Sequence, residues 1–171
     1  LLCKGYNRDF GVPIIIFRPF NIYGYGQNAK FLIPTIIEQA KTGYIELKDP
    51  RPKRDFIFIS DVIKAIELTI ESEFNDLEIF NLGNGISYSI DDLIQEIKKN
   101  YISNKIEVKY LNEYRAGEIF DTIADISYVK KKLKWIPEIS ISQGLKLIIN
   151  KMNKQEKRNS IGKLWVFFVI A

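Results

Sequence analysis

Apolar residues along the chain fall into short continuous runs that alternate with stretches of helical spacing. Ile14–Phe17 is a continuous run rich in β-branched residues, typical of a strand buried on both faces of a parallel sheet. The stretch 29–42 instead places its apolar residues on one face of a helix, and Gly43 follows where that helix should end. By the same criteria, strands are predicted at 45–47, 56–59, 78–82 and 106–110, and helices at 1–10, 60–71, 89–97, 128–133 and 140–152. This order of elements predicts an α/β domain.

Polar residues mark where several of these helices begin. Ser60 or Asp61 is expected to cap the second internal helix, because a side-chain oxygen at a helix start can accept a free backbone N–H. Asp125 is expected to cap the short helix over Tyr128–Leu133. Two capping boxes are predicted, from the pairs Ser89–Asp92 and Ser140–Gln143.

Composition narrows the classes of function. The chain has 171 residues, 46% of them apolar and 27% charged, which is ordinary for one globular domain. The net charge is +4, from 25 basic and 21 acidic residues mixed along the chain, so no nucleic-acid partner is predicted. The chain contains no histidine, which removes the commonest general base and the commonest metal ligand.

The single cysteine, Cys3, excludes an internal disulfide and a cysteine-rich zinc site, and no metal site is predicted. Cys3 is expected to be a buried apolar residue on the first helix. One unpaired cysteine also fits a reducing, cytoplasmic location.

The end of the chain departs from the pattern before it. A polar run at 151–160 is followed by eight apolar residues at 164–171, far fewer than the ~20 needed to span a membrane. No membrane partner is predicted. Residues 151–171 are interpreted as a tail that is disordered or artefactual, and the alternative is an apolar surface for a protein partner.

The first strand runs into the loop Arg-Pro-Phe-Asn-Ile-Tyr-Gly at residues 18–24. In an open α/β sheet, ligands bind at the carboxyl ends of the strands, and this loop leaves such an end. Its proline and glycine shape a turn that lets the backbone approach a ligand, and Asn21 can both donate and accept hydrogen bonds. The residues alone are also compatible with a purely structural turn.

Two arginines stand in motifs suited to a diphosphate. Arg54 opens Arg-Asp-Phe-Ile-Phe-Ile-Ser-Asp, and its guanidinium offers a bidentate fork to phosphate oxygens. Asp55 is expected to position this loop, since a carboxylate beside phosphate would be repelled. Arg115 opens Arg-Ala-Gly-Glu, in which Glu118 is an acceptor for hydroxyl groups. On the residues alone, Arg115 and Glu118 could equally form a surface salt bridge worth under ~1 kcal/mol.

Taken in order, these segments resemble the carboxyl-terminal half of the NAD-dependent epimerase/dehydratase family, an extended branch of the short-chain dehydrogenases that includes UDP-glucose 4-epimerase. The turn Asn-Leu-Gly-Asn-Gly at 81–85 and the closing Leu-Lys-Trp-Ile-Pro at 133–137 fit the same pattern, with Lys134 in place of the usual glycine. Trp135 is expected to be a packed aromatic. The likeness extends to about residue 150.

The resemblance implies an α/β fold in two parts: the carboxyl-terminal part of a Rossmann-like doubly wound sheet and a smaller α/β substrate-binding domain. Residues 1–28 would be the last portion of the Rossmann-like domain, and 29–150 the nucleotide-sugar-binding region. Elements near 56–85 belong to that region or are interleaved Rossmann elements. Because Ile14–Phe17 is an interior strand in this family, the chain alone is expected to expose an apolar sheet edge.

The same resemblance assigns the site residues. Pro19 and Phe20 would lie along the nicotinamide edge, and Asn21 would contact the diphosphate of a nucleotide sugar. Leu32 belongs to a segment that presses against the nucleotide, and Phe31 beside it stands where some relatives carry asparagine. The two arginines would bind the diphosphate and the glutamate a ribose hydroxyl, which gives the substrate-binding set Asn21, Leu32, Arg54, Arg115 and Glu118.

In this family a glycine-rich cofactor motif and a catalytic Tyr-x-x-x-Lys precede the segments matched here, and neither stands before those segments in this sequence. No catalytic residue is therefore assigned. The implied whole enzyme is a homodimer that binds NAD, or NADP, mainly through its amino-terminal half. It oxidises a UDP-sugar at C4 to a 4-keto sugar and reduces it from the other face, and this chain alone would be inactive.

Other interpretations stay open. A 4,6-dehydratase, a reductase or a decarboxylase of the same family would share these motifs. A non-catalytic nucleotide-sugar-binding module, or the relic of a split gene, would account for the missing cofactor and catalytic motifs.

Overall fold

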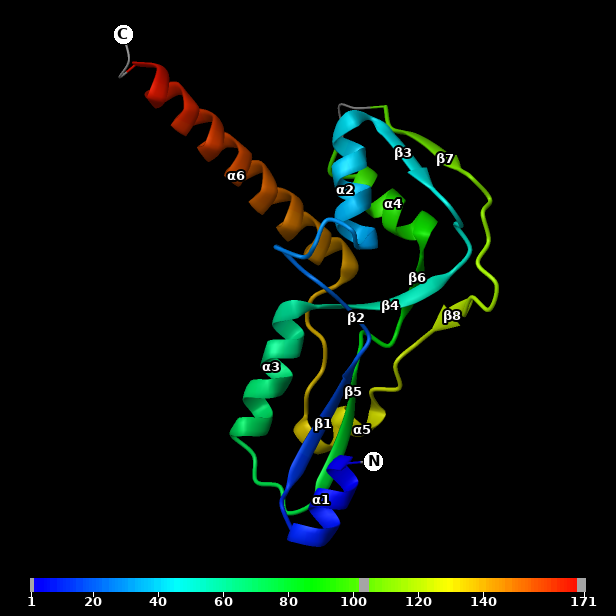
Figure 1. Cartoon of the computed structure of the whole chain (residues 1–171), viewed down its shortest axis with the longest axis vertical. Coiled ribbons are helices and arrows are strands. Elements are labelled where there is room, and N and C mark those ends of the chain that lie inside the picture. The colour runs from blue at the N-terminus through cyan, green and yellow to red at the C-terminus, as the bar shows by residue number, and fades with distance from the viewer. Residues whose placement is uncertain (1, 102–104, 169–171) are drawn as a thin grey trace.

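The computed structural model describes residues 2–101 and 105–168, without the side chains of 157 and 159–168. Each helix from α1 to α4 is followed by two strands, and α5 and α6 end the described chain. These elements form two regions, an upper and a lower one in Figure 1. The helices are α1 (Leu2–Phe10), α2 (Leu32–Thr42), α3 (Ile59–Ile70), α4 (Ile90–Lys98), α5 (Ser127–Leu133) and α6 (Ile141–Phe168). The strands are β1 (Ile14–Pro19), β2 (Asn21–Tyr23), β3 (Tyr44–Leu47), β4 (Lys53–Phe58), β5 (Leu77–Leu82), β6 (Ser87–Ser89), β7 (Glu107–Tyr110) and β8 (Asp121–Thr122).

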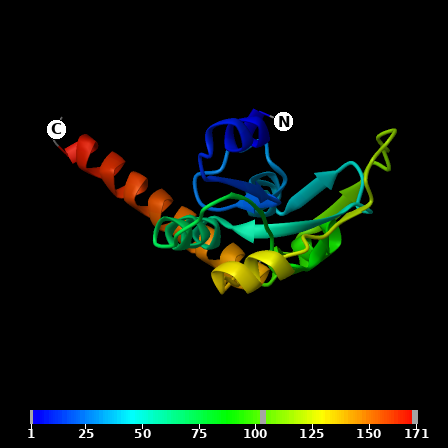
Figure 2. The ribbon, with the colours of Figure 1, turned by 90° about the horizontal axis from the view of Figure 1, so that it is seen from below.

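The lower region is built on the parallel pair β1–β5, whose register runs from Ile14 opposite Leu77 to Pro19 opposite Leu82. Figure 2 shows α1 on one side of this pair and α5 on the other. The core of this region lies between β5, α3 and α5. Its buried residues are Ile57, Val62, Ala65, Phe80, Leu82, Val129, Leu133 and Trp135.

The upper region is organised around β4, which pairs in parallel with β2 and β8 and antiparallel with β6. Strands β3 and β7 form a separate parallel pair, and α2, α4 and the start of α6 pack into the same core. Because side chains alternate along a strand, β4 contributes Phe56 to the upper core and Ile57 to the lower one. These parallel pairings confirm the predicted α/β class.

Several predicted helix starts are confirmed. Ser89 and Asp92 form a complete capping box at α4. Ser140 and Gln143 exchange the corresponding bonds before α6, at 2.9 and 3.3 Å. Trp135 is buried, and its indole Nε1 donates to the Asp61 carbonyl oxygen at 3.0 Å.

The start of α3 was predicted wrongly. The helix begins at Ile59, and its N-cap, Phe58, makes no side-chain cap bond with a described residue. Neither Ser60 nor Asp61 is the cap. Asp61 is buried in the first turn, where its carboxylate accepts the Ile139 N–H at 3.1 Å and ties the chain before α6 to α3. At α5 the N-cap is Ile126 and not Asp125 as predicted. Asp125 precedes the cap by one residue, and its carboxylate accepts the Ser127 N–H at 2.9 Å.

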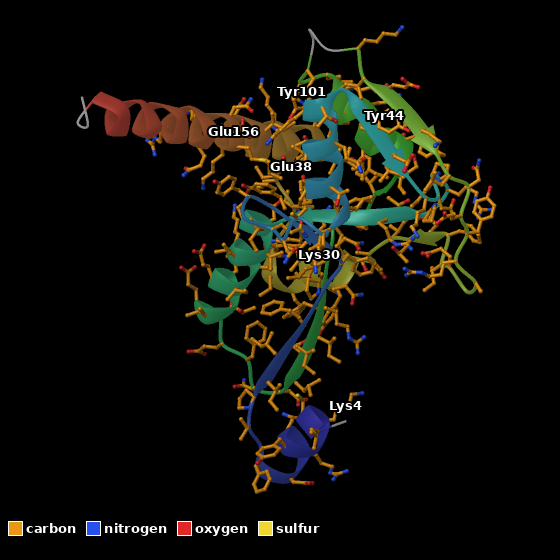
Figure 3. The ribbon with its side chains drawn as sticks, turned by 45° about the horizontal axis from the view of Figure 1, so that its top comes forward. Lys4, Lys30, Glu38, Tyr44, Tyr101 and Glu156 are labelled. Atoms are coloured by element: carbon orange, nitrogen blue, oxygen red, sulfur yellow. The ribbon has the colours of Figure 1, made fainter. Side chains whose placement is uncertain are left out.

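Two further expectations are corrected. Cys3 is exposed on α1, not buried. Helix α6 does not end near residue 152 but continues to Phe168, so residues 151–168 of the expected disordered tail are helical; 169–171 lie outside the described residues. Lys41 bridges Glu38 of α2 at 2.9 Å and Glu156 of α6 at 2.6 Å, which fixes α6 beside α2 (Figure 3). Within the described part of the chain, no helix combines the length and apolarity that crossing a membrane requires.

Candidate functional site

A cavity of about 770 Å³ lies at the carboxyl ends of β1 and β2. Its walls are β2 with the loop that follows it, the start of α2, Arg54 and Phe56 of β4, and the first residue of α3. Four residues assigned from the sequence line it: Phe20, Asn21, Leu32 and Arg54. The structure therefore brings together three motifs that are well separated in the sequence.

The other three assigned residues are not among the described residues that line this cavity. Pro19 ends β1 and is exposed. Arg115 is exposed in the loop after β7, and Glu118 is half-buried in the same loop. The cavity thus collects part of the assigned set, and the second arginine lies outside it.

Asn21 is held in place by the strand next to it. Its Nδ2 donates to the Asp55 carbonyl oxygen at 2.8 Å. Gln27 closes the same loop by donating from Nε2 to the Ile22 carbonyl oxygen at 2.9 Å. One of the two amide donors of Asn21 is therefore committed to the fold, and its Oδ1, to which no described residue donates, can accept a hydrogen bond from a ligand.

The tyrosine and glycine of this loop serve packing. Tyr23 is buried, and its hydroxyl donates to the Ser140 carbonyl oxygen at 3.4 Å. Burial raises the pKa of Tyr23 well above its ordinary value, which rules out a phenolate at neutral pH. Gly24 lies so close to Ile59 that a Cβ on it would stand 2.6 Å from the isoleucine Cγ2.

Asp55 joins the two regions beneath the cavity. It is fully buried, and its carboxylate accepts the backbone N–H groups of Asn84 at 2.6 Å, Gly85 at 2.9 Å and Ala124 at 3.0 Å. Any side chain on Gly83 would collide with Ala124 and with Asp55 itself. Asp55 thus positions loops, as the sequence predicted. The turn after β5 has glycine at position 83, and this leaves room for the Asp55 carboxylate.

Arg54 is fixed by three hydrogen bonds at the rim of the cavity. Its Nη1 donates to the carbonyl oxygens of Lys53 at 2.8 Å and Ile119 at 2.6 Å, and its Nη2 pairs with the Glu118 carboxylate. A guanidinium has five N–H donors, so within the described part of the chain Nε–H and one Nη2–H are left to bind an anion. A cation that is held rigidly and keeps two donors is well suited to a phosphate oxygen.

The loop 111–120 is fastened to the loop before β4 by contacts that the sequence did not predict. Arg51 lies over the ring of Tyr114, 3.6 Å from its centroid, and 5.1 Å from that of Phe120. Lys48 pairs with Glu113 at 3.0 Å. These partners are more than 60 residues apart, and no local pattern in the sequence signals their pairing. These contacts hold the loop 111–120 against the loop before β4, and Glu118 of the former thereby reaches Arg54.

Comparison with known proteins places this geometry in a family. Residues 1–83 match the family model "NAD dependent epimerase/dehydratase family". The chain is 35% identical over 154 residues to the UDP-glucuronate 4-epimerase of Thermodesulfobacterium geofontis, which covers 88% of this chain and 46% of the relative. It is 32% identical over 154 residues to the UDP-N-acetyl-alpha-D-glucosaminuronate decarboxylase of Bacillus cytotoxicus, covering 85% of this chain and 47% of the relative.

Solved structures agree. The crystal structure of a UDP-glucose 4-epimerase with UDP-glucose from Thermotoga maritima superposes with a TM-score of 0.80 at 26% identity, covering 90% of this chain and 50% of that one. The chain therefore spans about half the length of the relatives it matches. The motifs, the parallel α/β fold and these similarities show that the chain belongs to the NAD-dependent epimerase/dehydratase family.

Proposed function

We propose that this chain is the nucleotide-sugar-binding half of an NAD-dependent UDP-sugar 4-epimerase that works through a 4-keto sugar. The observation that carries the proposal is the meeting of Phe20, Asn21, Leu32 and Arg54 at one cavity. Relatives and structural neighbours named as UDP-sugar 4-epimerases support it.

In this proposal Arg54 anchors the diphosphate through its two remaining donors, and Asn21 offers Oδ1 to the same ligand. Binding energy gained at the diphosphate can then hold the reacting sugar in place. Arg115 is exposed and is not among the described residues that line the cavity, so its contact with a diphosphate is proposed from the resemblance alone. Glu118 keeps a second carboxylate oxygen that can accept a ribose hydroxyl while the first holds Arg54.

Pro19 and Phe20 are the residues of this chain that we propose to lie along a nicotinamide. Phe20 lines the cavity, and its N–H is fixed on the Leu82 carbonyl oxygen at 2.8 Å. When bound, NAD or NADP would supply hydride exchange with the sugar. Because neither the glycine-rich motif nor a Tyr-x-x-x-Lys stands before the loop at 18–24 in this sequence, the proposal places both in an amino-terminal half and makes this chain inactive alone. A cytoplasmic, homodimeric whole enzyme remains part of the proposal.

A second candidate within the family is another reaction on the 4-keto sugar, such as decarboxylation or dehydration. The similarity to a decarboxylase at 32% identity favours keeping it. Product analysis of the whole enzyme with UDP-glucose and UDP-glucuronic acid separates the candidates, since epimerisation conserves mass while decarboxylation and dehydration do not.

Calorimetric titration of this chain with UDP tests the binding role directly. We expect Arg54→Ala to weaken binding by about 2 kcal/mol, roughly thirtyfold. Arg8→Ala removes the same charge from exposed α1 and is the matched control, with no expected change. A dissociation constant for UDP that Arg54→Ala leaves unchanged would refute the assignment.

A further inference from the structure

Phe31 occupies the N-cap of α2, where a polar side chain normally satisfies a free backbone N–H. Its backbone is extended, with φ −80° and ψ 157°, and its side chain makes no cap bond with a described residue. Serine, threonine, aspartate and asparagine are preferred at this position because their side chains accept such a bond. The residue is therefore a poor choice for starting the helix.

Phe31 is also poorly placed for the core. Its side chain is 57% exposed, whereas Ile33, Ile36 and Ile37 of the same helix are almost completely buried. Phe31 therefore serves neither of the two structural roles expected at this position, capping the helix or packing in the core. Such local conflicts are expected where function, not stability, selects the residue.

The exposed ring lines the same cavity as Arg54 and Asn21. Tyr25 is the other strongly exposed aromatic on this cavity, but Lys151 lies over its ring, 4.4 Å from the centroid. Among the residues whose side chains the structure describes, no ring and no cation stacks on Phe31. Its aromatic face is thus available beside a cation suited to phosphate.

We propose that Phe31 is a specificity-determining residue whose ring stacks on an apolar face of the nucleotide sugar that Arg54 anchors. This inference rests on the proposed function. The stacked face belongs either to the base, which has a flat π-face, or to the sugar ring, which has an apolar face of C–H groups.

The variant Phe31→Asn separates binding from folding. Asparagine is among the best N-caps, so the thermal midpoint should stay equal or rise. The affinity for UDP-glucose should fall about tenfold, because a stacked aromatic contact is lost. A merely structural role would instead lower the thermal midpoint or leave both quantities unchanged.

Three further variants complete the design. Phe31→Tyr keeps the ring and should bind like the wild type. Phe31→Leu keeps apolar volume without the ring and should lose the same affinity as Phe31→Asn. Phe10→Asn makes the same change at a 69%-exposed aromatic on α1, remote from the cavity, and should change nothing in binding.

The two ligands UDP and UDP-glucose locate the stacked face. Equal loss for both ligands in Phe31→Asn assigns the base, and loss confined to UDP-glucose assigns the sugar ring. Unchanged affinity for both ligands in Phe31→Leu overturns the inference while the Arg54 result keeps the proposed function. Failure of the wild type to bind either ligand overturns both.

Discussion

Both regions of the molecule have a buried core, but only the lower region leaves its first strand and the apolar faces of two helices partly uncovered. In the upper region Ile36, Ile37 and Leu93 are completely buried. In the lower region all four residues of Ile14–Phe17 are only half-buried, and α1, which is described in full, buries none of its residues. Helix α3 likewise leaves a stripe of isoleucines exposed, at 59, 63, 66 and 70.

The difference shows that apolar pattern specifies what a segment can bury, not what it does bury. A strand as apolar as β1 is normally covered on both faces and paired on both edges. In the described part of the chain, β1 pairs with β5 alone. The upper core is closed by elements of this chain, whereas the lower one has the surface of a half-built sheet, in keeping with a chain that spans about half of its relatives.

The largest effect is expected where the two regions are joined. Asp55→Ala removes a fully buried carboxylate and leaves three N–H groups, one of them buried, without their acceptor, which should lower the free energy of unfolding by about 3–5 kcal/mol. Urea denaturation measures this. Asp121→Ala, at an exposed carboxylate on β8, is the control and should cost less than about 0.5 kcal/mol. A small loss at Asp55 would mean that the regions are not coupled through it.

Matched truncations test the contrast in burial itself. Ile36→Ala, in the closed upper core, should cost about 2–4 kcal/mol because it leaves a cavity. Ile63→Ala, on the 48%-exposed stripe of α3, should cost no more than about 0.5 kcal/mol in this chain. Equal losses would contradict the view that the lower surface is open. In a protein that also carries an amino-terminal half, the cost of Ile63→Ala is expected to rise.

Substituting two glycines, one in each region, tests how closely the surrounding atoms are packed. A Cβ on Gly144 would stand 2.7 Å from Cζ of the buried Tyr23, so Gly144→Ala should cost about 1–3 kcal/mol. A Cβ on Gly5 would meet no described atom within 4 Å, so Gly5→Ala should stabilise α1 by up to about 1 kcal/mol. Thermal unfolding of the two variants shows the signs, and a loss in Gly5→Ala would reveal a neighbour that α1 contacts in solution.

How much of the structure could be predicted from the sequence depended on whether each interaction joins residues close together or far apart in the chain. Local patterns identified β1, α2 and the Ser89 capping box, because period and cap chemistry act over a few residues. The short strands β2, β6 and β8 were missed, since two or three residues show no period. Asp61 was misjudged for a related reason: its carboxylate accepts the N–H of Ile139, 78 residues away, and not an N–H of its own helix.

The same distinction between local motifs and long-range contacts applies to the candidate site. The motif residues of the loop after β1 and the start of β4 meet at the cavity, because β2 follows β1 directly and pairs with β4, with Asn21 opposite Phe56. The pairing of Arg54 with Glu118 across 64 residues could not be read from either motif. Nor could the stacking of Arg51 on Tyr114, which holds the loop that carries Glu118.

The smallest predicted effect concerns the capping box at α4 in the upper region. Hydrogen bonds from Ser89 lower the pKa of Asp92. A carboxylate whose pKa is lower in the folded than in the unfolded chain stabilises the fold above its unfolded pKa, and this stabilisation is lost as the pH falls through the folded value. Ser89→Ala should therefore cost about 1 kcal/mol at neutral pH and less in acid. Urea titrations at several pH values measure both. Because the box lies in the closed region, an amino-terminal half should leave this cost unchanged, whereas the cost of Ile63→Ala should grow.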